Sequence, residues 1–378
     1  MDPLVILDAR DAYSPQLRGW GRYVRCLLDA LRASGEASGE GFQLRALTEG
    51  GAGPEVLFEQ LKLPVALARA RAALVHAPNC FLPLLAPCPG VVTVNDLAFE
   101  TWRSDFARAT GVKYRALTPL AVRRAARVIC PSAFTREDVC ERYGIDREKT
   151  RVIPDAPALP IGDLAPPPGP YVLAVGDLRR KKNLGALVRA FVALRRTPGI
   201  PHRLVLAGID CGEGPRLRAL AGSEPVELTG YVSDAHLDAL LRGAEVLVHP
   251  SLYEGFGLVV VEAMARGTPV VAARATALPE AGGDAALYFE PGSSGGSADR
   301  PRGGGSAHPE ERGSTHPEEP GSTHLEDGGS ADLARVLGGL LADPPALAAR
   351  SRRGREWVSR FSWERTARET AAIYRELL

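Results

Sequence analysis

The stretch that decides the fold is His249–Gly267, which reads HPSLYEGFGLVVVEAMARG. The short run before it, Glu245–Val248, is typical of a buried parallel strand. A polar loop follows, and a helix is predicted from about Gly257 to Gly267, because glycine favours a helix C-terminus and Pro269 prevents its continuation. In open α/β sheets, ligands bind beyond the carboxyl ends of the strands, so we expect a ligand at this loop.

The glycines of the loop favour an anion as that ligand. Gly255 and Gly257 allow the backbone to approach a bound group closely. The N–H groups of Phe256, Gly257 and Leu258 would face the ligand at a helix N-terminus, where the helix dipole attracts negative charge. A diphosphate fits such a site.

Two glutamates stand in this stretch, Glu254 before the turn and Glu262 eight positions later. Glu262 interrupts the apolar run VVVEAMA, and a carboxylate buried there is costly unless it has partners. Ribose hydroxyl groups would be suitable partners, and so would a neighbouring backbone amide or an arginine. The spacing alone favours neither interpretation.

A basic turn, Gly176–Asn183 with the sequence GDLRRKKN, follows the predicted strand Tyr171–Val175. Its four cations, Arg179–Lys182, stand where the strand ends and before a helix that begins near Asn183. Cations in this position would bind phosphate groups. The alternative is a solvated basic turn, but the position at a strand end favours the phosphate site.

The segment after the first predicted strand, Asp8–Tyr23, also has glycines next to a helix start. Gly19 and Gly21 flank Trp20, and Arg22 opens the predicted helix. This arrangement resembles a phosphate-facing loop, although a glycine pair before a helix is often only a turn. The motif is therefore weak on its own.

Short apolar runs alternate with amphipathic segments, which predicts an α/β protein with two Rossmann-like, doubly wound parallel sheets. The predicted strands are Leu4–Asp8, Phe42–Leu47, Leu74–His76, Val91–Asn95, Val128–Cys130, Tyr171–Val175, Arg203–Ala207, Val226–Leu228, Glu245–Val248 and Pro269–Ala273. The predicted helices are Arg22–Ala33, Thr110–Ala126, Ala133–Tyr143, Asn183–Arg196, Glu213–Ala221, Asp234–Arg242, Gly257–Arg266, Ala331–Ala342, Pro345–Phe361 and Trp363–Leu378. The proline-rich segment 154–170 is predicted to link domains at 1–165 and 170–360.

Residues 293–330 break this alternation and are predicted to be a disordered surface insertion. They contain three near-copies of an octapeptide, beginning at Gly305, Gly313 and Gly321, and lack apolar periodicity. His308, His316 and His324 recur beside acidic residues, which would suit weak metal binding. Repeat expansion in a tolerated loop is the simpler interpretation.

Composition excludes several classes of protein. The 378 residues carry a net charge of +1, with 45% hydrophobic and 24% charged residues, so no general affinity for nucleic acid is expected. The six cysteines are scattered without metal-ligand spacing, which indicates reduced thiols. The N-terminus lacks the pattern of a signal peptide, and no segment of about 18 apolar residues predicts a membrane span. A cytoplasmic location is therefore expected.

Several motifs together resemble glycosyltransferase family 4, the retaining transferases with the GT-B fold of two Rossmann-like domains facing across a cleft. They are Gly176–Asn183, Gly230–Asp234 (GYVSD), Pro250–Gly257 (PSLYEGFG), Glu262–Val271 (EAMARGTPVV) and Phe361–Glu364 (FSWE). The resemblance covers most of the chain outside the linker and the 293–330 insertion. The two glutamates separated by seven residues are the specific part, whereas the N-terminal matches are looser. The resemblance also implies that the last segment, 361–378, crosses back to the first domain.

The resemblance implies a role for each matching residue. It places the donor nucleotide sugar on Gly176, Arg180, Lys181, Lys182, Asn183, Tyr231, Val232, Ser251, Glu254, Gly255, Phe256, Gly257, Leu258 and Glu262. Glu254, Lys182 and Asn95 would be the catalytic residues, and Gly19, Gly21, Arg22 and Asp96 would face the acceptor and the phosphates. Glu262 would hold the ribose, and Tyr231 with Val232 would line the base. No metal or other cofactor is implied, because cations and a helix N-terminus replace it.

Two positions depart from the family pattern. Asn95 stands in VVTVND where the family commonly has histidine, and asparagine donates a hydrogen bond but cannot become cationic. Either donor choice has changed or turnover is reduced. Asp177 stands where many relatives have arginine, and Arg180 and Lys181 supply the cation nearby.

The resemblance implies retaining transfer of a hexose. Mannose from GDP-mannose is the first choice, because the PSLYEGFG subgroup often resembles mannosyltransferases, and UDP-sugars come next. The acceptor would be a glycan, a lipid-linked molecule or a small molecule. A non-catalytic paralogue that binds a donor or a partner is the main alternative, and a phosphorylase or an epimerase is a further one. The helix Thr110–Arg127 would either face water or rest on an anionic membrane. Its cations are Lys113, Arg115, Arg123, Arg124 and Arg127.

Overall fold

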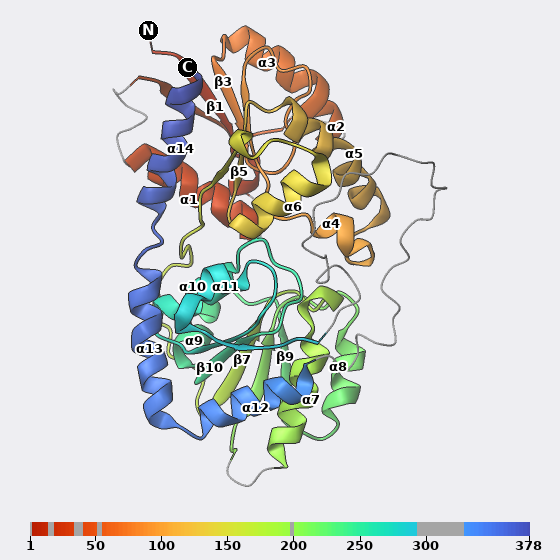
Figure 1. Ribbon diagram of the computed structural model, residues 1–378, viewed down its shortest axis with the longest axis vertical. Helices are drawn as coiled ribbons and strands as arrows, with labels where there is room; N and C mark the ends of the chain where they lie inside the picture. Colours follow the sequence, from red (N-terminus) through yellow and green to blue (C-terminus); the bar gives the residue numbers. More distant parts are fainter. Residues whose placement is uncertain (1, 14–18, 34–40, 51–54, 197–199, 293–328) are drawn as a thin grey trace, which may run out of the picture.

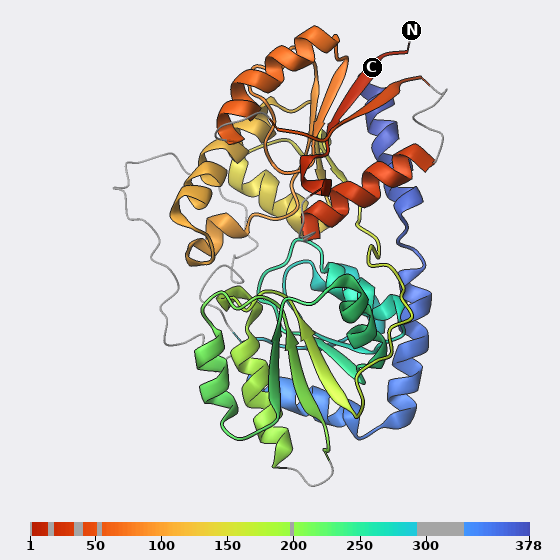
Figure 2. The ribbon, with the colours of Figure 1, turned by 180° about the vertical axis from the view of Figure 1, so that it is seen from behind.

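The computed structural model describes residues 2–13, 19–33, 41–50, 55–196, 200–292 and 329–378 (Figure 1). Within these ranges the chain forms two parallel sheets, one in each half, flanked by helices (Figures 1 and 2). The predicted class, α/β with two doubly wound parallel sheets, is therefore confirmed. The predicted insertion at 293–330 lies outside the described residues, except for its last two positions.

The N-terminal sheet has the strand order β2-β1-β3-β4-β5-β6, and all its pairs are parallel. Its strands are β1 (Leu4–Asp8), β2 (Gln43–Leu47), β3 (Leu74–Ala77), β4 (Gly90–Thr93), β5 (Arg127–Cys130) and β6 (Thr150–Val152). The sequence predicted the first five and missed β6, because three residues are too few to show a periodic pattern.

The C-terminal sheet has the order β12-β11-β10-β7-β8-β9, again parallel throughout. Its strands are β7 (Tyr171–Val175), β8 (Arg203–Ala207), β9 (Val226–Gly230), β10 (Val246–His249), β11 (Val270–Ala273) and β12 (Leu287–Phe289). The order reverses between β7 and β10, and ligands bind at such a switch point. The two segments that follow these strands are the basic turn and the glycine loop.

Helices connect the strands of both sheets. In the N-terminal half they are α1 (Gly19–Ala33), α2 (Glu55–Leu57), α3 (Leu63–Ala70), α4 (Ala98–Thr101), α5 (Arg108–Arg124) and α6 (Ala133–Tyr143). In the C-terminal half they are α7 (Leu184–Arg195), α8 (Gly214–Ala221), α9 (Asp234–Gly243), α10 (Leu258–Ala265), α11 (Leu278–Gly282), α12 (Ser330–Leu341), α13 (Pro344–Val358) and α14 (Trp363–Leu377). The sequence missed the short helices α4 and α11, and also α2 and α3, which a π-helical turn at Phe58–Lys62 joins.

Local sequence explains where α6 begins and ends. Ser132 Oγ accepts a hydrogen bond from the Thr135 N–H at 3.0 Å and caps the first turn. Gly144 has a φ of +62°, the left-handed conformation that ends a helix and that glycine adopts without strain. The helix therefore has the bounds that the sequence predicted, Ala133–Tyr143.

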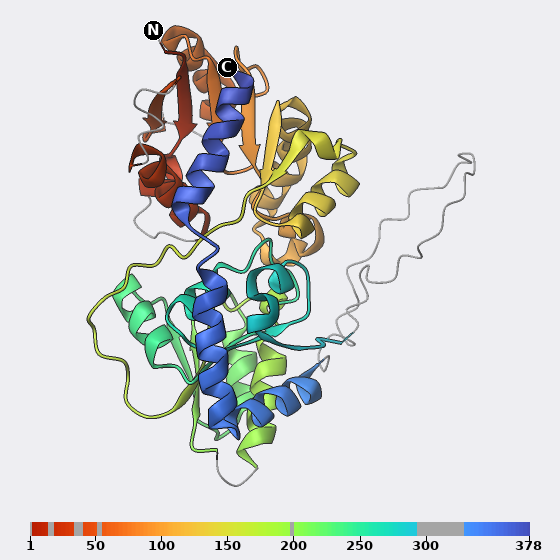
Figure 3. The same ribbon diagram turned by 60° about the vertical axis from the view of Figure 1, so that its left-hand side comes forward.

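The last two helices run along one side of both halves (Figure 3). Helix α13 packs on the C-terminal half, where Trp357 Nε1 donates to the Ala281 carbonyl at 2.7 Å. Helix α14 packs on the N-terminal half, because its residues Ala371 and Tyr374 are buried in one apolar cluster with Val5 of β1. The chain thus begins and ends in the same half.

Candidate active site

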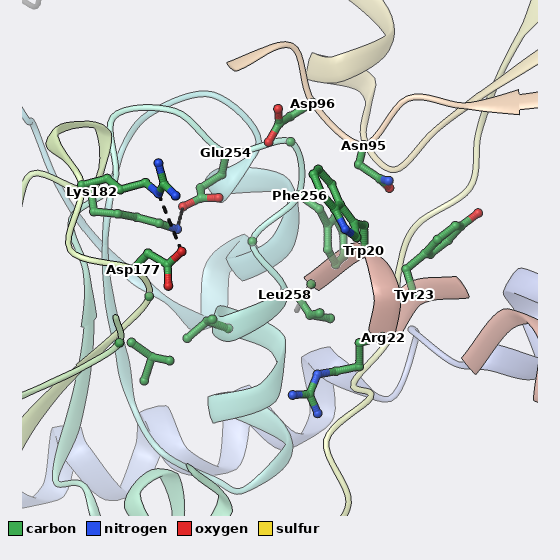
Figure 4. Close-up of a pocket in the computed structure, with 18 of the residues that line it drawn as sticks. Trp20, Arg22, Tyr23, Asn95, Asp96, Asp177, Lys182, Glu254, Phe256 and Leu258 are labelled. Carbon is green, nitrogen blue, oxygen red and sulfur yellow. Dashed lines mark hydrogen bonds and ion pairs between the residues drawn. The ribbon is translucent and has the colours of Figure 1, made fainter. Parts of the chain in front are cut away.

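A cavity of about 470 Å³ lies between the two halves, beyond the carboxyl ends of strands from both sheets (Figure 4). Its N-terminal wall includes Asn95 and Asp96 after β4, and Pro131 after β5. Its C-terminal wall includes Gly176 after β7 and Glu254 after β10. This is the size and position expected of a small-molecule site in an α/β protein.

The loop after β10 brings a helix N-terminus to the cavity. Gly257 has a φ of +112°, a left-handed conformation that requires glycine, and α10 begins at the next residue. Phe256, Gly257 and Leu258 all line the cavity. The unpaired N–H groups of a helix N-terminus and the helix dipole favour a negatively charged ligand in this position.

Glu254 forms a largely buried ion pair in the wall of the cavity. Lys182 Nζ donates to Glu254 Oε1 (Figure 4). His249 Nε2 lies 3.1 Å from the same oxygen. Burial opposes ionisation of Glu254, but Lys182, the hydrogen bond with His249 and Lys181 together hold the pKa of this carboxyl well below its ordinary value. Burial lowers the pKa of His249. The site thus holds a carboxylate beside an ammonium group.

The cations of the basic turn point in different directions. Arg179, Lys181 and Lys182 line the cavity, whereas Arg180 is exposed and lies outside the lining. The reason is local geometry: residues 180–182 form one tight 3₁₀ turn, from which successive side chains leave on different sides.

Two of these cations contact the N-terminal half. Arg179 Nη1 donates to the Asp105 carbonyl, and Lys181 Nζ lies 3.7 Å from Asp96 Oδ2. Burial opposes protonation of Lys181, but Asp96, Glu254 and Asp105 outweigh it and raise the pKa. The basic turn therefore joins the two walls of the cavity.

Glu262 has protein partners at both carboxylate oxygens. Oε1 accepts hydrogen bonds from the backbone N–H groups of Ala158 and Leu159 at 2.6 and 2.7 Å. Oε2 accepts a hydrogen bond from Arg266 at 2.8 Å. Backbone amides and an arginine, one of the two predicted interpretations, therefore satisfy this buried carboxylate. Glu262 also lines the cavity and ties the segment between the sheets to α10.

The N-terminal glycine loop reaches the same cavity through Gly19, Trp20 and Arg22. Both terminal nitrogens of Arg22 donate to the carboxylate of Asp234 at 2.8 Å, which joins α1 to α9. Trp20 is 44% exposed, and its ring stacks on Tyr114 with 6.3 Å between the ring centres. A large exposed aromatic side chain in a cleft is a typical ligand contact.

Asn95 and Asp96 form the opposite wall. Asn95 Nδ2 donates to the Pro78 carbonyl at 3.3 Å, and Asp96 Oδ1 accepts from the Ala98 N–H at 2.9 Å. A Cβ atom added to Gly255 would lie 1.7 Å from the Asn95 carbonyl oxygen. Glycine at 255 is therefore required for the close approach of the two halves.

Further hydrogen bonds hold the glycine loop against α6. The Gly255 carbonyl accepts from Ser132 Oγ at 2.6 Å and from Thr135 Oγ1 at 2.9 Å. The Tyr253 hydroxyl donates to Asp138 Oδ2 at 2.6 Å. The loop that lines the C-terminal wall is thus fixed by groups of the N-terminal half.

Most of the predicted site residues line this cavity. They are Gly19, Arg22, Asn95, Asp96, Gly176, Lys181, Lys182, Tyr231, Val232, Glu254, Gly255, Phe256, Gly257, Leu258 and Glu262. Gly21, Arg180, Asn183 and Ser251 do not: Gly21 and Ser251 are buried, Arg180 is exposed, and Asn183 is the left-handed residue before α7.

Several other lining residues were not predicted as site residues. His249, Trp20, Tyr23 and Asp234 line the cavity, and so does Arg179, which was predicted only as one of the four cations of the basic turn. His249 could have been predicted from the sequence, because it ends β10 directly before the glycine loop. The others depend on how the halves approach each other, which no local pattern reports.

Two predicted absences concern metals and membranes. In the described part of the chain, no three His, Cys, Asp or Glu side chains cluster as metal ligands would. Among the helices within the described ranges, none is both long and apolar enough to cross a bilayer. The predicted independence of metal stays a prediction.

Solved structures share this fold. Anabaena HepE, solved in complex with UDP-glucose, aligns with a TM-score of 0.67 over 99% of this chain and 100% of that one. The sequences are 18% identical, so this likeness concerns the fold alone. Two doubly wound parallel sheets that share one cavity define the GT-B class.

Family models identify the chain more closely. The model of glycosyltransferase family 4 matches residues 19–156, and the model of glycosyl transferases group 1 matches residues 169–300. The two matched regions contain both walls of the cavity. The chain belongs to glycosyltransferase family 4.

Two curated relatives show how far the similarity extends. O-antigen chain mannosyltransferase B of Escherichia coli is 38% identical over 125 residues, which are 32% of this chain and 33% of that protein. Glycogen synthase of Mycobacterium tuberculosis is 30% identical over 311 residues, 80% of this chain and 66% of that protein. This chain thus covers from one third to just under two thirds of these relatives.

Proposed function

We propose that this protein transfers a hexosyl group from a nucleotide diphosphate sugar to a hydroxyl acceptor, with retention of configuration. The observation that carries the proposal is the pairing of Lys182 with Glu254 beside the N-terminus of α10, inside a cavity between two sheets. Cations and a helix N-terminus suit a departing diphosphate. The whole activity, including its independence of metal, is inferred from these residues and from family membership.

The two walls of the cavity would bind different parts of the substrates. The amides of Gly255–Leu258 and the ammonium group of Lys182 would hold the diphosphate, and Glu254 would hold the transferring sugar. Tyr231 and Val232 would line the base, and Glu262 would contact the ribose while it remains bound to its backbone partners. Gly19, Arg22, Asn95 and Asp96 lie on the opposite wall, where the acceptor and the outer face of the phosphates would lie.

The reaction would proceed on one face of the sugar. The bond between the anomeric carbon and the phosphate oxygen breaks while the acceptor oxygen forms its bond on the same side. The departing phosphate oxygen takes the acceptor proton. The protein then contributes positioning and stabilisation of the charge that develops on the diphosphate.

Mannose is the first choice for the transferred sugar, because O-antigen chain mannosyltransferase B of Escherichia coli is among the relatives. Glucose is the alternative, since a glycogen synthase is also a relative and Anabaena HepE was solved with UDP-glucose. A second candidate function, donor binding without transfer, is favoured only by Asn95, which cannot become cationic.

The acceptor would be a glycan, a lipid-linked molecule or a small molecule. A lipid-linked acceptor would be consistent with contact between an anionic membrane and α5, whose residues Arg123 and Arg124 are exposed. A vesicle flotation assay with anionic lipid tests this contact, and protein that stays with the soluble fraction would contradict it.

The test of the proposed function is a panel of GDP-, UDP-, dTDP- and ADP-linked sugars. A donor at about 100 times its dissociation constant adds about 2.7 kcal/mol of stability, which raises the melting temperature by several degrees. Nucleoside diphosphate release and the anomeric configuration of the product are then measured with the donor that binds. Binding without any release, with water or sugar acceptors, would favour the non-catalytic function instead.

A further inference from the structure

Asp155 is a buried carboxyl group that has no part in the mechanism above. It follows β6, it is 8% exposed, and it lines the cavity on the N-terminal wall. Among the described residues, its Oδ1 has no hydrogen-bond partner. Buried polar atoms are nearly always hydrogen-bonded, so an unpaired oxygen beside a cavity takes its partner from what fills the cavity, a ligand or water.

The backbone on both sides of Asp155 is fixed by the last helix. The Pro154 carbonyl accepts a hydrogen bond from Thr366 Oγ1 at 2.8 Å, and the Pro157 carbonyl accepts one from Trp363 Nε1 at 2.9 Å. Both donors belong to α14. The segment therefore holds the carboxyl in place at the cavity wall and prevents it from turning out into water.

The elements packed around this segment carry few groups that change charge near neutral pH. Burial raises the pKa of Tyr23 on α1 and of Tyr374 on α14, and it lowers the pKa of His76 on β3 to about 3. Glu262 on α10 is bonded to backbone amides and an arginine. Burial raises the pKa of Asp155 to about 7, so its carboxyl titrates in the physiological range.

We propose that Asp155 binds a hydroxyl group of the carbohydrate substrate; this inference depends on the proposed glycosyl transfer. A hydroxyl donor satisfies the unpaired oxygen, whereas a phosphate or a carboxylate would be repelled. Tyr23 does not fill this role, since its hydroxyl lies 3.2 Å from Thr93 Oγ1 and forms no hydrogen bond with Asp155 Oδ1. The hydroxyl comes either from the donor sugar or from the acceptor sugar.

Binding of this kind has a measurable consequence. A hydrogen bond to the ionised carboxyl favours that form and lowers its pKa, so the protein releases a proton when the substrate binds. Release should be largest below the pKa of about 7, where the carboxyl is protonated before the substrate binds, and should fall toward zero as the pH rises above it. Affinity should rise with pH across the same range.

The experiment is isothermal titration calorimetry in two buffers of different ionisation enthalpy. GDP-mannose and UDP-glucose are titrated first, and methyl α-mannoside or methyl α-glucoside is then titrated into the complex with the matching nucleoside diphosphate. The variants are Asp155→Asn, which keeps the shape but cannot ionise, and Asp163→Asn as a control. Asp163 is exposed in the same segment.

If the nucleotide sugar causes proton release in the wild type and in Asp163→Asn but not in Asp155→Asn, the hydroxyl belongs to the donor. If Asp155→Asn abolishes proton release only in the titration with the methyl glycoside, the hydroxyl belongs to the acceptor. Equal proton exchange in wild type and Asp155→Asn, with both proteins binding the nucleotide sugar, would overturn the inference alone. Absence of any nucleotide-sugar binding to the wild type would overturn the proposed function and this inference with it.

Discussion

Replacing Lys182 with methionine removes the ammonium group from the ion pair with Glu254 and keeps the length of the side chain. The side chain of Lys182 packs over Gly176, where an added Cβ would lie 3.1 Å from Lys182 Cε. Methionine retains this contact, so the change isolates the charge. Glu254 then keeps His249 as a hydrogen-bond partner and Lys181 as a nearby cation.

The size of the effect follows from the burial of the pair. The Lys182 and Glu254 side chains are 15% and 14% exposed. Removing one partner of a fully buried pair costs about 3–5 kcal/mol, because the other charge is left without compensation. His249 and Lys181 still compensate part of the charge of Glu254 and so lower this cost. We therefore expect the free energy of unfolding to fall by about 2 kcal/mol. Turnover should fall by about 10²–10³, the loss typical of one charge-stabilising donor.

Two assays measure these effects. Urea unfolding at pH 7 gives the change in stability, and release of nucleoside diphosphate at saturating donor gives the change in turnover. Arg180→Met is the matched control, because Arg180 is the exposed cation of the same turn that does not line the cavity. Near-normal turnover of Lys182→Met, or an equal loss in Arg180→Met, would refute the assignment.

The same pair predicts a dependence of stability on pH. The folded-state pKa of Glu254 lies well below the ordinary value of 4.5, so its ionisation stabilises the fold above that value. This stabilisation is lost as the pH falls below 4.5 toward the folded-state pKa. In Lys182→Met the folded-state pKa should rise, because the largest favourable charge is gone. Because the loss occurs only between the ordinary pKa and the folded-state pKa, melting temperatures measured between pH 3 and 6 should decline less below pH 4.5 in the variant than in the wild type.

Three further predictions concern the contacts around the cavity. Arg266→Leu removes the cation paired with buried Glu262 and one of the two paired with Asp238, which keeps Arg242, and urea unfolding should show a loss of about 3 kcal/mol; a loss below about 1 kcal/mol would contradict this. Tyr253→Phe removes the bond to Asp138, and steady-state kinetics should show lower turnover with a stability loss of only about 1 kcal/mol. Gly255→Ala puts a methyl group against the Asn95 carbonyl, so small-angle scattering should show separated halves and the kinetics a loss of turnover; an unchanged scattering profile would contradict it.

The sequence predicted the positions of the site segments because both lie at strand ends. Glu245–Gly267 contains the full pattern of strand, glycine loop and helix, and this pattern is local. The direction of each cation in Arg179–Lys182 was not predictable, since it depends on one tight turn and on acceptors in the other half. Asp155 was missed for a similar reason, because its burial requires α14, more than 200 residues further along the chain.

The contacts of Gly255 imply that cleft closure and donor-site geometry are coupled. The carbonyl of this residue accepts hydrogen bonds from Ser132, the N-cap of α6, and from Thr135 in its first turn. The neighbouring residues Phe256–Leu258 carry the predicted diphosphate site. A change in the first turn of α6 therefore acts on a loop of the opposite half. If the halves separate, the loop loses these two donors and its N–H groups lose their fixed direction. Donor affinity should consequently depend on Ser132, although Ser132 lies on the acceptor side and its hydroxyl is occupied by the Gly255 carbonyl.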